Sequence, residues 1–169
     1  MREMDENGLL LSRLQGMVFE ASKDVVSCNS FMFIRRFMFS SFTLEELDSG
    51  HVLFDNETEY SIIKNIESEY KESSYGKEKY SKDELYWIGY IYRYMAYTNE
   101  LTSRQCFRII KPNELRSLYN IYHTLDCSNA IDRILEDKGY DFTPEGLNKR
   151  ALDIYRRLFE EKNNKKASI

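Results

Sequence analysis

The chain has 169 residues, enough for one domain with a substantial hydrophobic core. Its formal net charge is −4 and its pI is about 5.4, so overall charge does not drive it onto nucleic acid or anionic lipid. Aromatic residues make up 14% of the sequence, which excludes a disordered chain, while 7 Gly and 2 Pro leave few turns for many short strands. We therefore expect a single all-α domain over residues 1–169.

The cysteines and histidines indicate the redox compartment and limit the cofactors that the chain could bind. Cys28, Cys106 and Cys127 are odd in number and widely spaced, which is typical of reduced thiols in a cytoplasmic protein. The first residues lack the features of a signal peptide, and no run of about 18 apolar residues predicts a membrane span. Because His51 and His123 lie far apart and no cysteine pair has ligand spacing, we expect no metal and no cofactor.

The N-terminal part predicts two helices. Apolar residues three and four apart indicate a helix that begins after Asn7, its expected N-cap, and runs to about residue 21. Residues 31–39 are too evenly apolar for a surface helix and predict a buried one, whose arginines reach a rim or an internal carboxylate. A strand is the alternative there, and the pattern leaves open whether this segment is core or interface.

Two motifs predict helix starts in the next segment. Thr43 opens a capping box ahead of a short helix that should stop near Gly50. Thr58 can cap another helix with isoleucines at positions 62, 63 and 66. Residues 71–82 then turn polar and are the expected flexible connection.

The next helix is expected to be the centre of the fold. Ser81 and Glu84 form a capping box that opens a helix over about residues 82–98. Apolar character almost all round this helix predicts neighbours on most sides. Gly89 in its middle costs roughly 1 kcal/mol relative to alanine, so we expect another backbone to cross closely there. One stripe of the helix is tyrosine-rich: Tyr86, Tyr90, Tyr94 and Tyr97.

Further helices follow at short intervals. Thr102 opens a third capping box, and the short helix after it ends at Pro112, near which a second short helix begins. Asp126 can cap a helix that Gly139 closes.

The last predicted helix begins at Pro144, and a basic tail over residues 162–169 follows it. About eight helices are expected in total, arranged around the central tyrosine-rich helix. The last helix is expected to bury five apolar side chains: Leu147, Ala151, Ile154, Tyr155 and Leu158.

No pattern in the sequence predicts an enzyme. It has no glycine-rich phosphate loop and no hydrolase motif. His123 and Cys127 have the spacing of a Cys–His pair, but no third residue that would orient them is identifiable. Carboxylate pairs such as Glu45 and Glu46 are explained by helix starts, where the helix dipole favours them. The expectation is therefore a binding protein without catalytic activity.

Arg93 lies beside the tyrosine stripe and has two interpretations. A buried arginine needs a partner because an unpaired charge is costly to desolvate, so an internal ion pair is one of them. A partner-binding surface is the other, because arginine and tyrosine are common interface anchors. The candidate residues for that surface are Arg93, Tyr90, Tyr94, Tyr97, Tyr122 and His123.

DNA binding is the alternative function. Residues 102–119 have the dimensions of a helix-turn-helix, although Pro112 and Asn113 replace the usual glycine-bearing turn. Leu115 and Leu118 indicate that the second helix is largely buried. The candidate nucleic-acid contacts are Arg104, Arg108, Lys111 and Arg116.

Several stretches carry a family resemblance: ELYWIGYIYRY at 84–94, IIKPNELR at 109–116, YHTLD at 122–126, and the set Ala130, Ile131, Arg133 and Ile134. They resemble a family of small uncharacterised bacterial proteins that tend to be found beside toxin-type genes, including ADP-ribosyltransferase-like ones, and that are often labelled antitoxins. Residues 31–48 are similar more loosely, and the sequence after residue 139 lies outside the resemblance.

The resemblance implies a protein that neutralises a cognate toxin by occluding its active site or its fold, and it carries over no catalytic residue. An acidic antitoxin with a complementary partner fits that implication. The sequence departs from the family at Met95, where a second tryptophan is expected, and at Asn120, Ile121 and Cys127, which replace proline-rich positions. These departures concern the partner surface more than the fold. A phage-encoded inhibitor of a host protein is a variant of the same interpretation.

Overall fold

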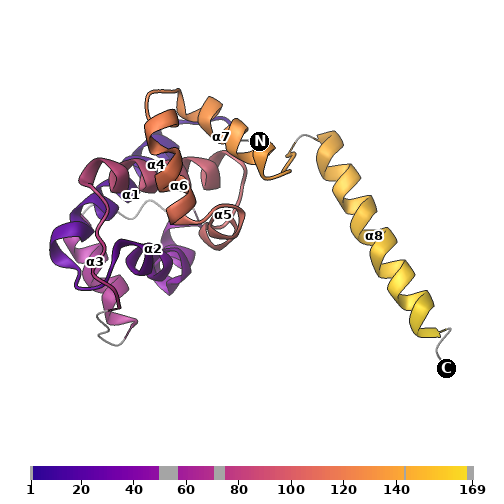
Figure 1. Ribbon diagram of the computed structural model, residues 1–169, viewed down its shortest axis with the longest axis horizontal. Helices are drawn as coiled ribbons and strands as arrows, with labels where there is room; N and C mark the ends of the chain where they lie inside the picture. Colours follow the sequence, from indigo (N-terminus) through magenta and orange to yellow (C-terminus); the bar gives the residue numbers. More distant parts are fainter. Residues whose placement is uncertain (1, 50–56, 71–74, 143, 167–169) are drawn as a thin grey trace.

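A computed structural model describes residues 2–49, 57–70, 75–142 and 144–166 (Figure 1). Every regular element in these ranges is a helix, which confirms the all-α prediction. Eight are α-helices, as expected, and the additional element η1 is a short π-helix. In chain order they are α1 (Glu6–Val25), α2 (Ser30–Phe39), η1 (Thr43–Leu47), α3 (Glu59–Ser68), α4 (Lys82–Thr98), α5 (Ser103–Ile109), α6 (Pro112–Tyr122), α7 (Cys127–Asp137) and α8 (Pro144–Lys166).

Helix α4 is the centre of the fold and contacts α1, α5, α6 and α7. Its most extensive contact is with α1. The two helices are antiparallel, because Asp24 at the end of α1 pairs with Lys82 at the start of α4, and Arg2 ahead of α1 bonds to Thr98 at the end of α4. A Cβ atom at Gly89 would lie 2.6 Å from the backbone oxygen of Gln15 and 3.0 Å from the Cα atom of Gly16. The close helix crossing that Gly89 predicted is therefore confirmed.

Helix α2 belongs to the hydrophobic core, which settles whether residues 31–39 are core or interface. Phe33 and Phe37 are fully buried, and the ring of Phe19 on α1 meets them edge-on at centroid distances of 6.0 and 5.0 Å. Arg36 reaches a carboxylate as expected, with its Nη1 2.9 Å from Glu67 Oε2 on α3. The segment is a helix and not the alternative strand.

Most helix starts follow the predicted caps. Thr58, Ser81 and Thr102 each accept a hydrogen bond from the third residue of the following helix, and each forms a complete capping box. The cap of α1 is Asp5 instead of Asn7, because the Asp5 carboxylate accepts from the backbone N–H of Gly8 at 2.9 Å.

Thr43 is the second correction, because it lies inside η1 and caps nothing. Its backbone N–H donates to Ser40 Oγ at 3.1 Å, and its carbonyl accepts from Asp48 five residues later at 2.9 Å. That i to i+5 bond defines a π-turn in place of the predicted short α-helix. The expected stop at Gly50, like His51, lies outside the described residues.

Residues 75–81 are held to the helices, in contrast to the predicted flexible connection. The backbone oxygens of Tyr75 and Glu78 accept from the N–H groups of Asn29 and Ser30 at 3.1 and 3.0 Å. Tyr80 is 3% exposed, and its N–H donates to Ser30 Oγ at 3.0 Å. These bonds satisfy free N–H groups at the start of α2. The polar composition of the segment could not predict them, because their partners lie far away in the sequence. Residues 71–74 lie outside the described ranges.

Helix α8 projects away from the other helices, and none of its described side chains belongs to the core (Figure 1). Leu147, Ile154 and Tyr155, which were expected to be buried, are exposed. The chain turns after α7 at Gly139, whose φ of 69° is the left-handed conformation that commonly ends a helix. The helix continues through Lys166 where a basic tail was expected, and residues 167–169 and the Leu158 side chain lie outside the description.

Candidate functional site

Arg93 lies inside the molecule, with 2% of its surface exposed. Its Nη1 donates to Asp48 Oδ1 at 2.9 Å and to the backbone oxygen of Leu47 at 3.2 Å. Its Nη2 donates to Ser103 Oγ at 2.7 Å, and its Nε donates to Gln15 Oε1 at 2.8 Å. The expectation that Arg93 contributes to a partner surface is corrected, and the internal ion pair is the interpretation that the structure supports.

Both carboxylate oxygens of Asp48 also accept hydrogen bonds, so the network around Arg93 connects several helices. Its Oδ2 accepts from the backbone N–H of Ser103 at 2.9 Å, and its Oδ1 accepts from the Ser103 hydroxyl at 2.7 Å. The Asp48 side chain is 5% exposed. Because both charges are buried and hydrogen-bonded, the pair joins α1, η1, α4 and α5 in one arrangement.

The tyrosine stripe of α4 divides into an exposed and a buried part. Tyr86, Tyr90 and Tyr94 are half-buried, and successive ring centroids lie 6.2 Å apart along the helix; we call these three residues the tyrosine ladder. Burial raises the pKa of the Tyr90 and Tyr94 hydroxyls, so both stay neutral hydrogen-bonding groups. Tyr97 is buried instead, and its hydroxyl donates to Asp5 Oδ1 at 2.5 Å. That contact holds the N-terminus of α1 and removes Tyr97 from a partner surface.

Tyr122 and His123 lie at the end of α6, where His123 is exposed and Tyr122 is half-buried. The His123 ring stacks on Tyr119 at a centroid distance of 4.5 Å, with its Nδ1 2.8 Å from the Tyr119 backbone oxygen. Tyr119 in turn meets Trp87 of α4 edge-on at 5.7 Å. His123 is therefore linked to α4 through Tyr119 and Trp87.

The cysteines are not activated as nucleophiles. Burial raises the pKa of the half-buried Cys127 thiol, and the neighbouring Asp126 carboxylate raises it further. Burial also raises the pKa of Cys106 to about 12. A reactive cysteine needs a lowered pKa, so these environments favour the protonated thiol.

The candidate DNA-contacting residues of α5 and α6 are largely engaged within the chain. Arg116 Nε lies 3.0 Å from Glu84 Oε1, and its Nη1 pairs with Glu78. These two carboxylates offset the positive charge that a phosphate contact would use.

The basic side chains of α5 and of the turn after it have the same character. Lys111 Nζ donates to the backbone oxygen of Phe107 at 2.9 Å and lies over the Phe107 ring at 4.4 Å. Arg104 Nη2 donates to the backbone oxygen of Phe39 at 2.9 Å. Arg108 is exposed. The predicted basic face therefore consists mainly of side chains that stabilise the fold.

Helix α8 presents an apolar face that the body of the protein does not cover. At 3.6 residues per turn, the apolar positions of 147–159 share one side of the helix, and the polar positions 149, 153 and 156 share the other. Five large side chains of the apolar side are between 47% and 68% exposed: Leu147, Leu152, Ile154, Tyr155 and Phe159. Contiguous exposed apolar surface of this kind is typical of an interaction site.

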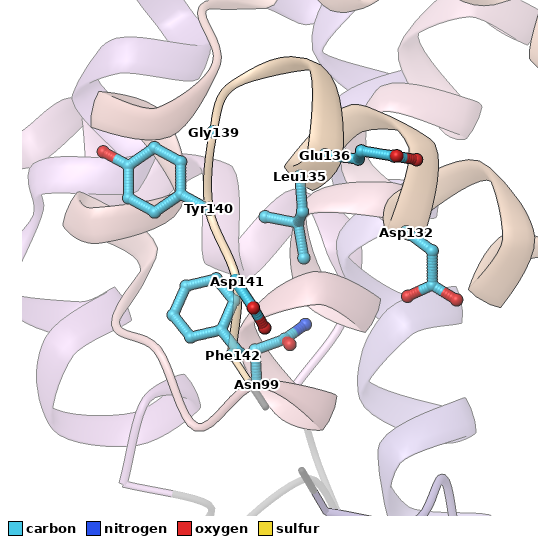
Figure 2. A pocket seen from close by; sticks show the side chains of 8 residues that line it. All are labelled: Asn99, Asp132, Leu135, Glu136, Gly139, Tyr140, Asp141 and Phe142. Carbon is cyan, nitrogen blue, oxygen red and sulfur yellow. The ribbon is translucent and has the colours of Figure 1, made fainter. Parts of the chain in front are cut away.

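A pocket of about 460 Å³ lies where the chain leaves α7, and Figure 2 shows the side chains around it. This volume is within the range of roughly 300–1,000 Å³ that is usual for ligand pockets. Three of the lining residues are acidic. The pocket is lined by Asn99, Asp132, Leu135, Glu136, Gly139, Tyr140, Asp141 and Phe142.

Asn99 gives this pocket an unsatisfied acceptor. The residue is 9% exposed, and its Oδ1 is buried and receives no hydrogen bond in the structure. Its Nδ2 donates to the backbone oxygen of Met95 and to Thr98 Oγ1, both at 3.2 Å, and these bonds fix the orientation of the amide. A buried acceptor without a donor costs about 1–3 kcal/mol.

Sequence reasoning missed this pocket because its residues come together only when the end of α4 packs beside α7. A signal was present in the aromatic–acidic–aromatic run 140–142 that follows Gly139. Asp132 and Glu136, four residues apart on one helix face, are a second signal.

Comparison of the chain with models of protein families, with curated proteins and with solved structures finds no match. Within the described part of the chain, no three His, Cys, Asp or Glu side chains are grouped so that they could hold a metal ion. Among the same residues, no helix combines the length and the apolar character needed to cross a bilayer.

Proposed function

We propose that this chain is a non-enzymatic protein-binding module, antitoxin-like in type, and that the apolar face of α8 is its main contact surface. The observation that carries the proposal is the exposure of five large apolar side chains along one side of α8. Water-exposed apolar area of this extent is stabilised when a partner covers it. A single amphipathic helix most simply binds by lying in a groove of another protein.

The charge of α8 indicates the chemistry of its partner. Residues 144–166 contain seven basic and four acidic residues, whereas the whole chain carries a net charge of −4. The helix is therefore a basic segment on an acidic protein. A partner with an apolar groove and an acidic rim would match both the face and the charge.

The tyrosine ladder supplies a second contact in this proposal. Its rings are half-buried, and tyrosine combines a large apolar area with a polar end, as interface anchors commonly do. Leu10 and Met17, on the adjacent helix α1, are also exposed. The ladder belongs to the stretch that resembles the antitoxin-like family, whereas α8 lies outside it.

The family resemblance supports a toxin as the partner and the product of a neighbouring gene as the first protein to examine. Binding would neutralise the toxin by covering its active site. We propose that the complex forms in the cytoplasm, where the three free cysteines would remain thiols.

The proposal is tested by co-expressing the full chain with the product of the adjacent gene and measuring whether the two purify as a stoichiometric complex. Substituting Leu147, Ile154 and Phe159 together by serine should abolish the complex, because the apolar face is lost.

A triple substitution to serine of Lys149, Asp153 and Arg156, on the polar side of the same helix, serves as the matched control. It should leave the complex intact, and both variants should keep the helix content of the wild type. Absence of a complex with the wild-type chain, or equal behaviour of the two variants, would refute α8 as the contact surface.

A further inference from the structure

We propose that the pocket between the end of α4 and α7 binds the guanidinium group of an arginine side chain from a partner protein. The inference goes beyond the proposed function, because α8 contributes no lining residue to this pocket. Its walls combine negative charge, aromatic rings and an unsatisfied acceptor.

The negative charge comes first from α7. Asp132 and Glu136 lie four residues apart on the exposed side of α7, and Figure 2 shows both side chains at the same edge of the pocket. Asp141 adds a third carboxylate, although it also lines an adjacent pocket with Lys149. The recognition therefore rests on the two α7 carboxylates, which can accept hydrogen bonds from the fork of a guanidinium.

The aromatic rings favour a planar cation. Tyr140 and Phe142 alternate along the chain after Gly139, and their rings stack with a centroid distance of 5.9 Å and an interplanar angle of 13°. Guanidinium groups bind over aromatic faces while their edges donate hydrogen bonds, which the compact ammonium of lysine does less well. The pocket therefore suits arginine better than lysine.

Asn99 supplies a buried acceptor without a donor, and this feature distinguishes a ligand site from an ordinary solvated acidic surface. Its amide extends from the end of α4 into the ring of lining side chains (Figure 2). Because Nδ2 is held by Met95 and Thr98, Oδ1 is left as the atom that requires a donor. Because Oδ1 is buried, a guanidinium N–H would satisfy it after a small shift of the lining side chains. The three carboxylates do not form a group that could hold a metal ion.

The test is an NMR titration of the full chain with arginine blocked at both ends as N-acetyl-arginine amide. The matched neutral probe is blocked citrulline, which has nearly the same shape without the charge. Blocked arginine should shift the Asn99 side-chain amide and the Gly139 backbone amide saturably, whereas blocked citrulline should leave both signals unchanged. Equal shifts from the two probes, or no saturable shift, would overturn the proposal.

Two variants assign the effect to the pocket. Asp132→Asn with Glu136→Gln should weaken binding of blocked arginine by about tenfold, because both charged acceptors are lost. Asp137→Asn with Glu145→Gln removes the same charge outside the pocket and should change affinity by less than about twofold. Equal weakening by both pairs would mean general electrostatic attraction and would contradict a built site.

Titration with free arginine distinguishes a site for an arginine side chain of a protein from a site for the free amino acid. Free arginine adds an ammonium and a carboxylate of opposite charge beside the side chain, and a site that recognises only the guanidinium should bind it no more tightly than blocked arginine. Tighter binding of free arginine would overturn the partner assignment. The lining residues and the Asp132 and Glu136 substitutions lie outside α8, so failure here leaves the helix-docking proposal standing, and failure of helix docking leaves the pocket standing.

Discussion

At the scale of single residues, two polar contacts join segments that are distant in the sequence. Arg93 of α4 pairs with Asp48 at 2.9 Å, and both side chains are almost fully buried. Tyr97, also of α4, donates its hydroxyl hydrogen to Asp5, the N-cap of α1. These contacts hold η1 and the start of α1 against the central helix.

Removing the Arg93 charge should destabilise the fold. Arg93→Met leaves the Asp48 carboxylate buried without its cation, which typically lowers the free energy of unfolding by about 3–5 kcal/mol. Urea unfolding measures this loss, and Arg108→Met at an exposed position should change stability by less than about 0.5 kcal/mol. Adding Asp48→Asn to Arg93→Met should restore part of the loss, and a variant as stable as the wild type would contradict the role of the ion pair.

The Glu84 carboxylate should make stability depend on acid pH. Burial raises the pKa of Glu84, but hydrogen bonds from the backbone N–H of Ser81 and from Arg116 outweigh it and hold the pKa below the ordinary 4.5. A lowered pKa in the folded state stabilises the protein above the ordinary value, and this contribution is lost as pH falls through the folded pKa.

Glu84→Gln should therefore reduce the fall in unfolding free energy below about pH 4.5 relative to the wild type. Urea titrations between about pH 7 and pH 3 measure the two slopes. Identical slopes would mean that Glu84 is not the titrating group.

At the scale of helices, local chemistry was predictable and long-range contact was not. The capping boxes at Thr58, Ser81 and Thr102 depend on residues three apart, so the sequence specifies them directly. Thr43 fits the same pattern, yet its backbone N–H donates to Ser40 Oγ and the π-helix η1 forms instead. The exposed position of α8 could not be predicted, because an amphipathic helix has the same pattern whether its own core or another chain covers it.

Gly89→Ala distinguishes helix propensity from packing. Propensity alone would stabilise α4 by roughly 1 kcal/mol. However, the new Cβ would lie 2.6 Å from the Gln15 backbone oxygen, and relieving that clash by moving α1 should cost about 1–3 kcal/mol or more. We expect a net loss of stability in urea unfolding, whereas Asn120→Ala on exposed α6 should gain a few tenths of a kcal/mol. A more stable Gly89→Ala protein would contradict the close crossing.

At the scale of the whole molecule, α1 to α7 share one core and α8 lies outside it (Figure 1). The composition predicted the fold class because few turn residues and many apolar ones suit helices. The candidate partner surface was predicted only in part: Tyr90 and Tyr94 are partly exposed as it requires, while Arg93 and Tyr97 are internal. The pocket beside Asn99 depends on the packing of two helices, which no local pattern encodes.

The most direct test of the account is calorimetric titration of the adjacent gene product with two neighbouring single variants of α8. Ile154→Ser, on the apolar side, should weaken binding at least about tenfold, equivalent to roughly 1.4 kcal/mol. Asp153→Ser, on the polar side, should stay within about twofold of the wild type. Unchanged affinity for Ile154→Ser in a folded protein would contradict the claim that α8 is the surface through which this chain binds its partner.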